Sequence, residues 1–370
     1  MKVALVVPGG VDRSGELRVV PALLALIKRM AARHEVHVYA LRQEAEPGDW
    51  PLLGAQVHNI GGRSSRLGIL RAVLAIRAEH RQAPFDLVQA IWSGSSGLVA
   101  VLAARTLGLP SAVHLAGVEL VAIESIGYGG RLRWRGRLRE ALVLRGANRL
   151  TAASQPMLDQ LGALGHAAQR LPLGVDLDTW PACAPLARDM REPLRLVHVA
   201  SINRVKDPFT LLNALEILHR LGLHFHLDIV GEDTLRGQIQ QMAQRLGVAG
   251  KIRFHGFLTR SQAWGVVSQA HVHLVTSMHE AGPLALLEAA VAGVPSVGTR
   301  VGHLAEWEGE AALVVDVGDA QAMALAIQQL GRDDDLRLRL AHEAQRRALL
   351  EGADHSVALM EAMWGELSGR

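Results

Sequence analysis

The sequence predicts an α/β protein made of two doubly wound, parallel-sheet domains. Two observations predict this fold class. Short runs of apolar and β-branched residues alternate with helical stretches along the chain, which is the pattern of a parallel sheet covered by helices on both faces. The alternation starts again near residue 194, and a chain of 370 residues that is 49% hydrophobic is long enough to bury two cores.

Charge separates the two halves. Residues 1–175 carry 21 Lys or Arg against 12 Asp or Glu, whereas residues 176–370 carry 18 against 24. A basic first half suits nucleic acid, anionic lipid or a phosphorylated acceptor as a partner. Nucleic acid is the weakest of the three, because aromatic residues make up only 4% of the chain and no nucleic-acid motif is present.

Cysteine content and hydropathy predict the compartment. The single cysteine, Cys183, permits no internal disulfide and suggests a reducing environment. No apolar run is long enough to span a membrane, and the N-terminus enters a strand pattern without a signal peptide. We therefore expect a cytoplasmic protein.

The first half opens like a βαβ unit. A buried strand at 2–7 leads through a glycine-rich turn into a helix at about 17–33, and a second strand follows at 35–40. The glycines do not have the Gly-x-Gly-x-x-Gly spacing, which argues against a dehydrogenase. Further strands at 86–91 and 111–115, with helices at 67–82 and 97–107, extend the pattern.

An arginine-rich stretch covers residues 131–149, with seven arginines and one tryptophan. It has two interpretations. One is a solvated helix face that leads into a strand at 149–153. The other is an interfacial patch that brings the protein to the inner face of an anionic membrane.

Residues 276–306 predict a strand, a tight turn and a helix. Pro283 takes the first helical position, so the free amides of the first turn include Leu284 and Ala285. Glu280 lies at the turn and Glu288 on the helix. Two carboxylates around an amide-rich helix start suit a ligand that has hydroxyls at one end and an anion in the middle, as a nucleotide sugar has. The alternative is that Glu280 only stabilises the helix start and that Glu288 is a solvated surface residue.

This stretch resembles the Glu-x7-Glu signature of the family-four retaining glycosyltransferases, glycosyl transferases of group 1 with GT-B architecture. Besides the two glutamates, the resemblance includes the helix end at 292–295 and the later Gly302 and Glu306. It implies two Rossmann-like domains that face a central cleft, a nucleoside-diphosphate sugar as donor, and no required metal or cofactor.

The resemblance assigns the donor site chiefly to the second half. Ser201-Ile-Asn-Arg-Val-Lys-Asp resembles the diphosphate-binding segment, with Lys206 at the lysine position and Ser201 where arginine is usual, so that Arg204 would replace that arginine. Gly231 resembles the first glycine of the family's Gly-x-Gly after the second strand, although the second glycine is missing. Phe257 and Leu258 match the positions where backbone groups meet the base. The sequence does not distinguish UDP from GDP. The implied donor-binding residues are Gly15, Ser201, Arg204, Lys206, Gly231, Leu258, Glu280, Gly282, Leu284, Ala285 and Glu288.

His114, Lys206 and Glu280 are the implied catalytic residues. His114 ends the strand at 111–115, and the family's sugar-contacting histidine is likewise followed by glycine and an acidic residue. A core histidine is the alternative. The resemblance implies that the Gly15 loop approaches the donor diphosphate and the acceptor from the first domain. The alternative is a loop that only needs a positive φ angle. Asp176-Leu-Asp178 has the form of a metal motif, but its place in a linker favours a turn.

The resemblance also divides the chain. Residues 170–181 resemble the hinge that ends the first domain, with Leu173 in place of the usual asparagine. We expect an acceptor-side domain at 1–175, a nucleotide-sugar domain at 176–350, and a terminal helix at 351–370 that packs back on the first domain.

The expected function is transfer of a hexose-type sugar, with retention, to a glycan, lipid-linked or small-molecule acceptor in cell-surface polysaccharide or glycolipid synthesis. Two alternatives remain. A nucleotide-sugar epimerase shares the two-domain layout. The departures at Leu173 and Ser201, and the altered turn at 280–283, also allow a catalytically silent protein that binds sugar nucleotides.

Overall fold

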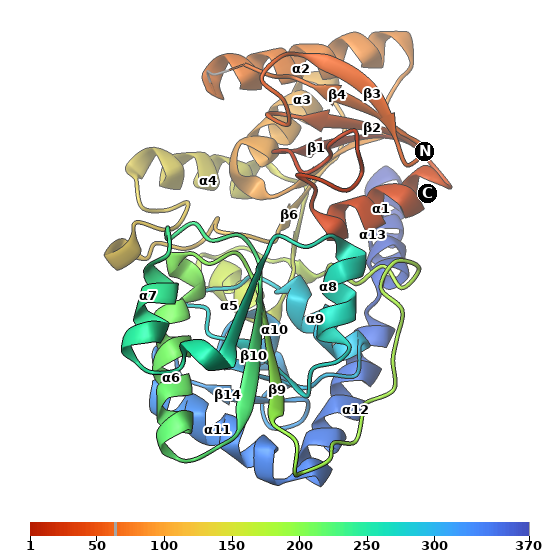
Figure 1. The fold of residues 1–370 in the computed structure, drawn as a ribbon. Helices are drawn as coiled ribbons and strands as arrows, with labels where there is room; N and C mark the ends of the chain where they lie inside the picture. The colour runs from red at the N-terminus through yellow and green to blue at the C-terminus, as the bar shows by residue number, and fades with distance from the viewer. Residues whose placement is uncertain (63–64, 370) are drawn as a thin grey trace. The chain divides into compact units, whose positions relative to one another are not determined.

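The computed structural model describes residues 1–62 and 65–369 (Figure 1). The chain divides into two compact units. The first unit consists of Met1–Asp176 and Ala353–Arg370, and the second of Leu177–Gly352. Each contains a largely parallel sheet with its own hydrophobic core, so the predicted class of two doubly wound α/β domains is confirmed.

The first unit is built on an eight-stranded sheet in the order β3-β4-β2-β1-β5-β6-β7-β8. Its strands are β1 (Lys2–Val7), β2 (Glu35–Ala40), β3 (Gly48–Leu52), β4 (Ala55–Asn59), β5 (Leu87–Ile91), β6 (Ser111–Leu115), β7 (Arg149–Ala152) and β8 (Gln169–Arg170). The pairing is parallel except between β3 and β4. Since the strand order reverses between β1 and β5, the carboxyl ends of these two strands form the switch point of the sheet.

The β3–β4 hairpin was absent from the sequence prediction. Its two-residue turn consists of Leu53 and Gly54, both with positive φ angles of 50° and 86°. Such a turn matches the twist of a hairpin but normally carries Asn-Gly or Asp-Gly, so Leu53 gave no turn signal. Pro51 is tolerated because β3 is an edge strand.

The helices of the first unit are α1 (Pro21–Ala31), α2 (Ser65–Gln82), α3 (Leu98–Leu107), α4 (Trp134–Gly146), α5 (Gln155–Ala163) and α13 (Ala353–Ser368), with a π-helical turn η1 (Ser93–Gly97) before α3 and a 3-10 turn η2 (Glu124–Ile126). α1 is shorter than the expected helix at 17–33, because the loop before Pro21 folds back through a Val11–Val19 bridge. The terminal helix α13 packs against α1, and its Trp364 donates a hydrogen bond of 3.0 Å to the buried Gln89.

The second unit has a six-stranded, fully parallel sheet in the order β11-β10-β9-β12-β13-β14. Its strands are β9 (Leu194–Val199), β10 (Phe225–Val230), β11 (Ile252–Gly256), β12 (Val272–Val275), β13 (Ser296–Thr299) and β14 (Ala312–Val315). Counted within the unit, this is the order 3-2-1-4-5-6 of the dinucleotide-binding fold. Its switch point lies between the carboxyl ends of β9 and β12.

The helices of the second unit are α6 (Pro208–Arg220), α7 (Gln238–Arg245), α8 (Arg260–Val267), α9 (Leu284–Val291), α10 (Gly302–Trp307), α11 (Ala320–Arg332) and α12 (Asp334–Leu350), with 3-10 turns η3 (Arg204–Lys206) and η4 (Ala249–Lys251). Asp207 caps α6 by accepting from the Thr210 amide, and Asp333 caps α12 by accepting from the Leu336 amide. The buried apolar faces of α6 and α11 share the core with β9 and β10.

Candidate functional site

Two loops meet at the switch point of the second unit. One follows β9 and contains the η3 turn, and the other follows β12. The Thr276 hydroxyl donates to the carbonyl of Lys206 at 2.8 Å, and the Met278 amide donates to the carbonyl of Val205 at 2.7 Å. Because the parallel strands β9 and β12 are neighbours, the loops that follow them lie side by side. The two hydrogen bonds fix one loop to the other.

Lys206 and Glu280 form an ion pair between these loops. The Lys206 Nζ lies 2.5 Å from Glu280 Oε1, and the Ser277 hydroxyl donates to the same oxygen at 2.6 Å. The Lys206 side chain is 25% exposed and the Glu280 side chain 13%. The pair is therefore largely desolvated, and Glu280 does more than stabilise the α9 dipole.

The turn between Glu280 and α9 depends on a glycine from elsewhere in the chain. Gly302 has φ of 48°, and a Cβ there would lie 2.9 Å from Pro283 Cδ and 3.2 Å from the Glu280 carbonyl oxygen. Pro283 itself is the N-cap, with ψ of 111°, so the expectation of Pro283 as the first helical residue is wrong. The helix begins one residue later, at Leu284, which places Gly282, Leu284 and Ala285 around its N-terminal end.

Glu288 lies on α9 with its side chain only 12% exposed, so it is not a solvated surface residue. Burial raises the pKa of its carboxyl group to about 7, and the nearby Arg260 opposes this rise. Arg260 Nη2 lies 3.4 Å from Glu288 Oε1, and the guanidinium stacks over the Trp180 ring at 5.7 Å. Arg260 Nε and Nη2 are buried without a hydrogen-bond partner among the described residues. Both members of this pair thus retain unused hydrogen-bonding capacity.

The remaining residues predicted for the donor site follow β9, β10 and β11 of the second unit. Ser201 and Arg204 are exposed in the loop after β9. Gly231, after β10, has φ of 144°, and a Cβ there would lie 2.1 Å from the Ala200 carbonyl oxygen, so glycine is needed for close approach of the two strand ends. Leu258, after β11, is half-buried, and the adjacent Phe257 is 52% exposed.

Three residues of this region were missed by the sequence interpretation: Arg260, Ser277 and His198. Arg260 carried no signal because its partner Glu288 lies 28 positions away and is met only through folding. The sequence did contain a signal for Ser277, since it lies three residues before Glu280. His198 is fully buried on β9, where burial lowers its pKa and where the charges of Lys206 and Glu280 also act on it. Its Nδ1 bonds to the Leu274 carbonyl at 2.9 Å.

His114 lies on β6 in the first unit and is fully buried. Its Nδ1 bonds to the Thr151 hydroxyl at 2.9 Å, and Nε2 has no partner among the described residues. Burial lowers the pKa of the imidazole to about 3, so the ring is neutral near pH 7. A sugar-contacting role for His114 stays a prediction.

Gly15 lies in the loop after β1. Its φ is 70°, and its amide donates to the Asp12 carbonyl at 3.0 Å. In the same loop, the amides of Gly10 and Val11 donate to the Gln43 side-chain oxygen at 2.7 and 2.9 Å. The positive φ explains the glycine as a turn residue, and contact with a donor remains a prediction for Gly15.

Two buried acids lie near the switch point of the first unit, just beyond β5 and β6. Glu119 Oε1 accepts from the Ser93 amide at 3.2 Å, and the Ser93 hydroxyl donates to both oxygens of Glu140 at 2.8 and 2.9 Å. Burial raises the pKa of both carboxyl groups, that of Glu140 to about 7. Trp92, which precedes Ser93, has φ of 67°, a strained value for a bulky residue.

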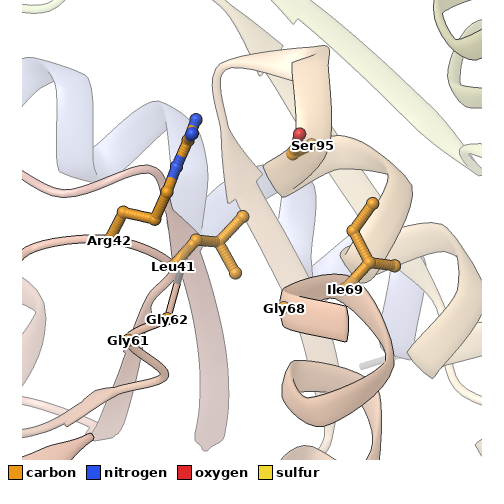
Figure 2. Close-up of a pocket in the computed structure, with 7 residues that line it drawn as sticks. All are labelled: Leu41, Arg42, Gly61, Gly62, Gly68, Ile69 and Ser95. Atoms are coloured by element: carbon orange, nitrogen blue, oxygen red, sulfur yellow. The ribbon is translucent and has the colours of Figure 1, made fainter. Parts of the chain in front are cut away.

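A small, open hollow lies beyond the carboxyl ends of β2 and β4 (Figure 2). Figure 2 shows Leu41 and Arg42 on one side and Ser95 and Ile69 on the other. It is lined by Leu41, Arg42, Gly61, Gly62, Gly68, Ile69 and Ser95. This edge of a parallel sheet is the usual side for ligands.

Across residues 1–62 and 65–369, the group of side chains spaced for a metal ion is Glu35, His37 and Glu79. The Lys2 ammonium lies 3.0 Å from Glu35 and 2.6 Å from Glu79, so a lysine cation already pairs with both acids. Asp176, from the Asp-x-Asp motif, accepts from Arg29 at 2.9 Å. In the described part of the chain, no helix combines the length and apolar character that crossing a bilayer requires.

Comparison with known proteins gives matches in both units. Residues 188–347 match the family described as glycosyl transferases group 1, and residues 19–174 match the glycosyl transferase 4-like domain. The lipopolysaccharide core biosynthesis glycosyltransferase LpsE of Rhizobium meliloti is 34% identical over 119 residues, which is 31% of this chain and 34% of that protein. The chain spans between about a third and two thirds of the length of the curated relatives it matches first.

Solved structures show the same fold over nearly the whole chain. Sucrose-phosphate synthase from Thermosynechococcus elongatus superposes with a TM-score of 0.83 at 18% identity, covering 99% of both chains. Anabaena HepE, solved with UDP and glucose, has a TM-score of 0.76 at 17% identity and covers 99% of this chain and 100% of its own. The two family matches together cover most of the sequence, and the chain therefore belongs to the group 1 glycosyl transferases, the family-four type with the GT-B fold.

Proposed function

We propose that the protein transfers a hexose-type sugar, with retention of configuration, from a nucleoside-diphosphate sugar to a glycan or lipid-linked acceptor. The observation that carries the proposal is the desolvated Lys206–Glu280 ion pair at the switch point of a nucleotide-binding sheet. The name of LpsE favours a role in cell-surface polysaccharide or glycolipid synthesis. The UDP and UDP-glucose complexes of HepE make UDP, beside GDP, a donor nucleotide to test.

In this proposal the second unit binds the donor through three kinds of contact. Glu288 accepts the two ribose hydroxyls, which would supply the hydrogen bonds its buried carboxylate lacks. Lys206 and the exposed Arg204 neutralise the diphosphate, and Glu280 with the α9 amides holds the sugar hydroxyls. Ser201, Gly231 and Leu258 complete the contacts to phosphate and base, and the exposed Phe257 offers a ring on which the base can stack.

Transfer then needs charge stabilisation more than a covalent intermediate. The bond from the anomeric carbon to the diphosphate oxygen breaks, and the acceptor oxygen forms its bond on the same face. The acceptor proton passes to the departing diphosphate. Lys206 stabilises the negative charge that develops on that leaving group. Because Arg204 and Lys206 supply the positive charge, we expect transfer to continue in EDTA.

The first unit would contribute the acceptor side. The neutral ring of His114 can exchange a hydrogen bond with a sugar without adding charge, since its pKa of about 3 keeps it unprotonated. The Gly15 loop follows β1, whose end is at the switch point of that sheet. Both assignments come from the family pattern and are part of the proposal.

Calorimetric titration tests donor binding first. UDP, GDP and their glucose or mannose conjugates are titrated into wild-type protein and Lys206→Ala, with Lys251→Ala as a matched lysine control in the same unit. We expect micromolar binding of one nucleotide class that Lys206→Ala weakens and Lys251→Ala does not. Absence of binding to all of them would overturn the proposal.

Product analysis then separates transfer from the alternatives. The preferred donor is incubated with lipid and glycan extracts, and NMR of the product reports the anomeric configuration. A retained linkage supports the proposal. Conversion of the donor sugar without acceptor would identify an epimerase, and tight binding with no transfer to any extract would identify a silent binding protein.

A further inference from the structure

Three helices of the first unit form one layer on one face of its sheet. α2, α3 and α4 follow β4, β5 and β6, and these three crossovers advance across the sheet in the same direction. Right-handed crossovers therefore place all three helices on the same face. α3 packs against both α2 and α4 (Figure 1). Gly146 of α4 approaches Val101 of α3 so closely that a Cβ would lie 2.5 Å from the valine methyl.

The outer surface of α4 carries an apolar ridge among its arginines, where a surface helix is normally polar. Trp134, Leu138 and Leu142 are 62%, 54% and 52% exposed. Their four-residue spacing places them on one side of the helix. The opposite side is buried through Val143 and Leu144. Both sides of α4 thus carry apolar residues, and only one of them contacts the protein core.

α2 repeats this arrangement. Leu67, Leu70 and Leu74 are 54%, 56% and 53% exposed at spacings of three and four, while Ala72, Val73 and Ile76 face the interior. Leu102, on α3 between the two helices, is 39% exposed. The apolar surface therefore extends well beyond the arginine-rich stretch at 131–149. We call the outward-facing side chains of α2, α3 and α4 the α2–α4 face.

The charges on this face have one sign. Its exposed arginines are Arg71, Arg81, Arg105, Arg135, Arg137 and Arg145. The acidic residues of the three helices are Glu79 and Glu140. The first is bound to the Lys2 ammonium at 2.6 Å, and the second is buried against Ser93. Neither neutralises the surface arginines.

We propose that the α2–α4 face docks on an anionic lipid bilayer, with Trp134 and the leucines at the depth of the headgroups and upper acyl chains. Tryptophan and leucine beside arginines are typical of surfaces that lie in the membrane interface. Arginine side chains can keep their stems along the apolar surface while the guanidinium reaches lipid phosphates. A second copy of the chain fits poorly, because a two-fold contact through this face would place arginines against arginines.

Binding at a bilayer would bring the enzyme to a lipid-linked acceptor, and that consequence rests on the proposed function. The docking itself does not, so it is tested without donor or acceptor. The full chain is sedimented with vesicles of phosphatidylcholine alone, and with vesicles that contain one third phosphatidylglycerol, at low and high NaCl. We expect pelleting only with the anionic vesicles, and less of it at high salt.

Two variants test separately the apolar side chains and the positive charges of the surface. Trp134→Ser/Leu138→Ser/Leu142→Ser removes the apolar ridge of α4, and Arg135→Gln/Arg137→Gln/Arg145→Gln removes its charge. Because all six side chains are exposed, we expect melting temperatures close to wild type. Each arginine removed should lower the partition coefficient about fivefold, and the serine variant should abolish pelleting. Leu70→Ser/Leu74→Ser provides a second, independent test on α2.

Matched controls come from the second unit, where equivalent side chains are exposed outside any such surface. Leu221→Ser/Leu325→Ser/Leu350→Ser and Arg191→Gln/Arg332→Gln/Arg339→Gln should bind vesicles as wild type does. Equal pelleting with neutral and anionic vesicles, or equal losses in test and control variants, would overturn the proposal. So would sedimentation equilibrium that shows a wild-type dimer and a monomeric serine variant, because the face would then be an interface between copies.

Discussion

Glu280 and Glu288 belong to one signature eight positions apart, yet the structure gives them opposite electrostatic settings. Glu280 is at the end of a loop, where Lys206 and Ser277 both donate to one oxygen at 2.5 and 2.6 Å. Glu288 is a largely buried residue of α9, and burial raises its pKa to about 7. The nearby cation, the Arg260 guanidinium, lies 3.4 Å away. One acid is satisfied by the protein, and the other is left with capacity for a ligand.

The difference follows from where each acid sits on the fold. Loops at a switch point bring side chains from two strands together, so Glu280 meets a lysine that is 74 residues away. A residue on a helix packed against the sheet gains burial instead. An unsatisfied buried carboxylate costs stability, and such sites persist where a ligand supplies the missing hydrogen bonds. The comparison predicts that the two acids respond in opposite ways to substitution.

The largest effect is expected for Lys206→Ala. It removes the cation that would stabilise the departing diphosphate and leaves the Glu280 carboxylate without its ion-pair partner. Loss of one such electrostatic contact lowers kcat by about 100- to 1,000-fold. Steady-state kinetics with the preferred donor checks this, with Lys251→Ala as control. If Lys206→Ala keeps more than a tenth of wild-type kcat, the ion pair has no role in the chemical step.

Glu288→Gln should separate binding from stability. A hydrogen bond to a charged group contributes about 1.5–3 kcal/mol, so donor affinity should fall about 10- to 100-fold. The melting temperature at pH 8 should rise by a few degrees, roughly 3 °C per kcal/mol, since the variant no longer buries an ionised carboxylate. The melting temperature of Glu280→Gln should not rise, because this substitution breaks a formed ion pair. Titration calorimetry and thermal melts of both variants give the two readings.

A Glu288→Gln protein that melts lower than wild type at pH 8 would contradict the comparison, whatever its donor affinity. Glu216→Gln on α6 is the matched control, since that acid is paired with Arg220 at 2.7 Å on the surface of the same unit. We expect it to change neither donor affinity nor melting temperature beyond the error of the measurement.

The pH dependence of wild type gives a third test. Since the native pKa of Glu288 is raised above its unfolded value, its contribution to stability is full below about pH 4.5 and is lost as pH rises through about 7. Donor affinity should move in the other direction, because only the carboxylate accepts both ribose hydroxyls. We expect about a tenfold gain in affinity between pH 6 and pH 8. A gain of the same size in Glu288→Gln would assign the titration to another group.

The sequence predicted much of this site because its residues follow short, local rules. A strand followed by Ser201 to Asp207, and a strand followed by Glu280 and a helix, identify two strand ends before any fold is known. The fold class followed from the same alternation. What the sequence lacked was pairing across space, so Arg260 and His198 were missed. The β3–β4 hairpin was missed for a different reason, because Leu53 occupies a turn position that glycine or asparagine normally signals.

Exposure was the other property that a sequence pattern could not supply. The arginines at 131–149 allowed either a solvated helix or a membrane patch, and periodicity alone placed Leu138 and Leu142 on one helix face without saying whether that face is buried. The packing of α4 on α3 shows that the face with Leu138 and Leu142 is exposed, because Val143 and Leu144 take the inner positions. A helix with apolar residues on both sides is ambiguous until its neighbours are known.

The smallest effect is expected for Arg260→Gln. This variant tests directly how far Arg260 controls the pKa of Glu288. Arg260 opposes the rise of the Glu288 pKa, so its removal should raise that pKa further and move the midpoint of donor affinity to higher pH. At pH 8 affinity should fall about two- to fivefold, as for a partly exposed ion pair. Titrations of the donor nucleotide from pH 6 to pH 9 measure the midpoint, with Arg332→Gln as a surface control. A lower affinity with an unchanged midpoint would mean that Arg260 contacts the nucleotide itself. Its buried Nε and Nη2, which have no hydrogen-bond partner among the described residues, would then donate to the ligand rather than to Glu288.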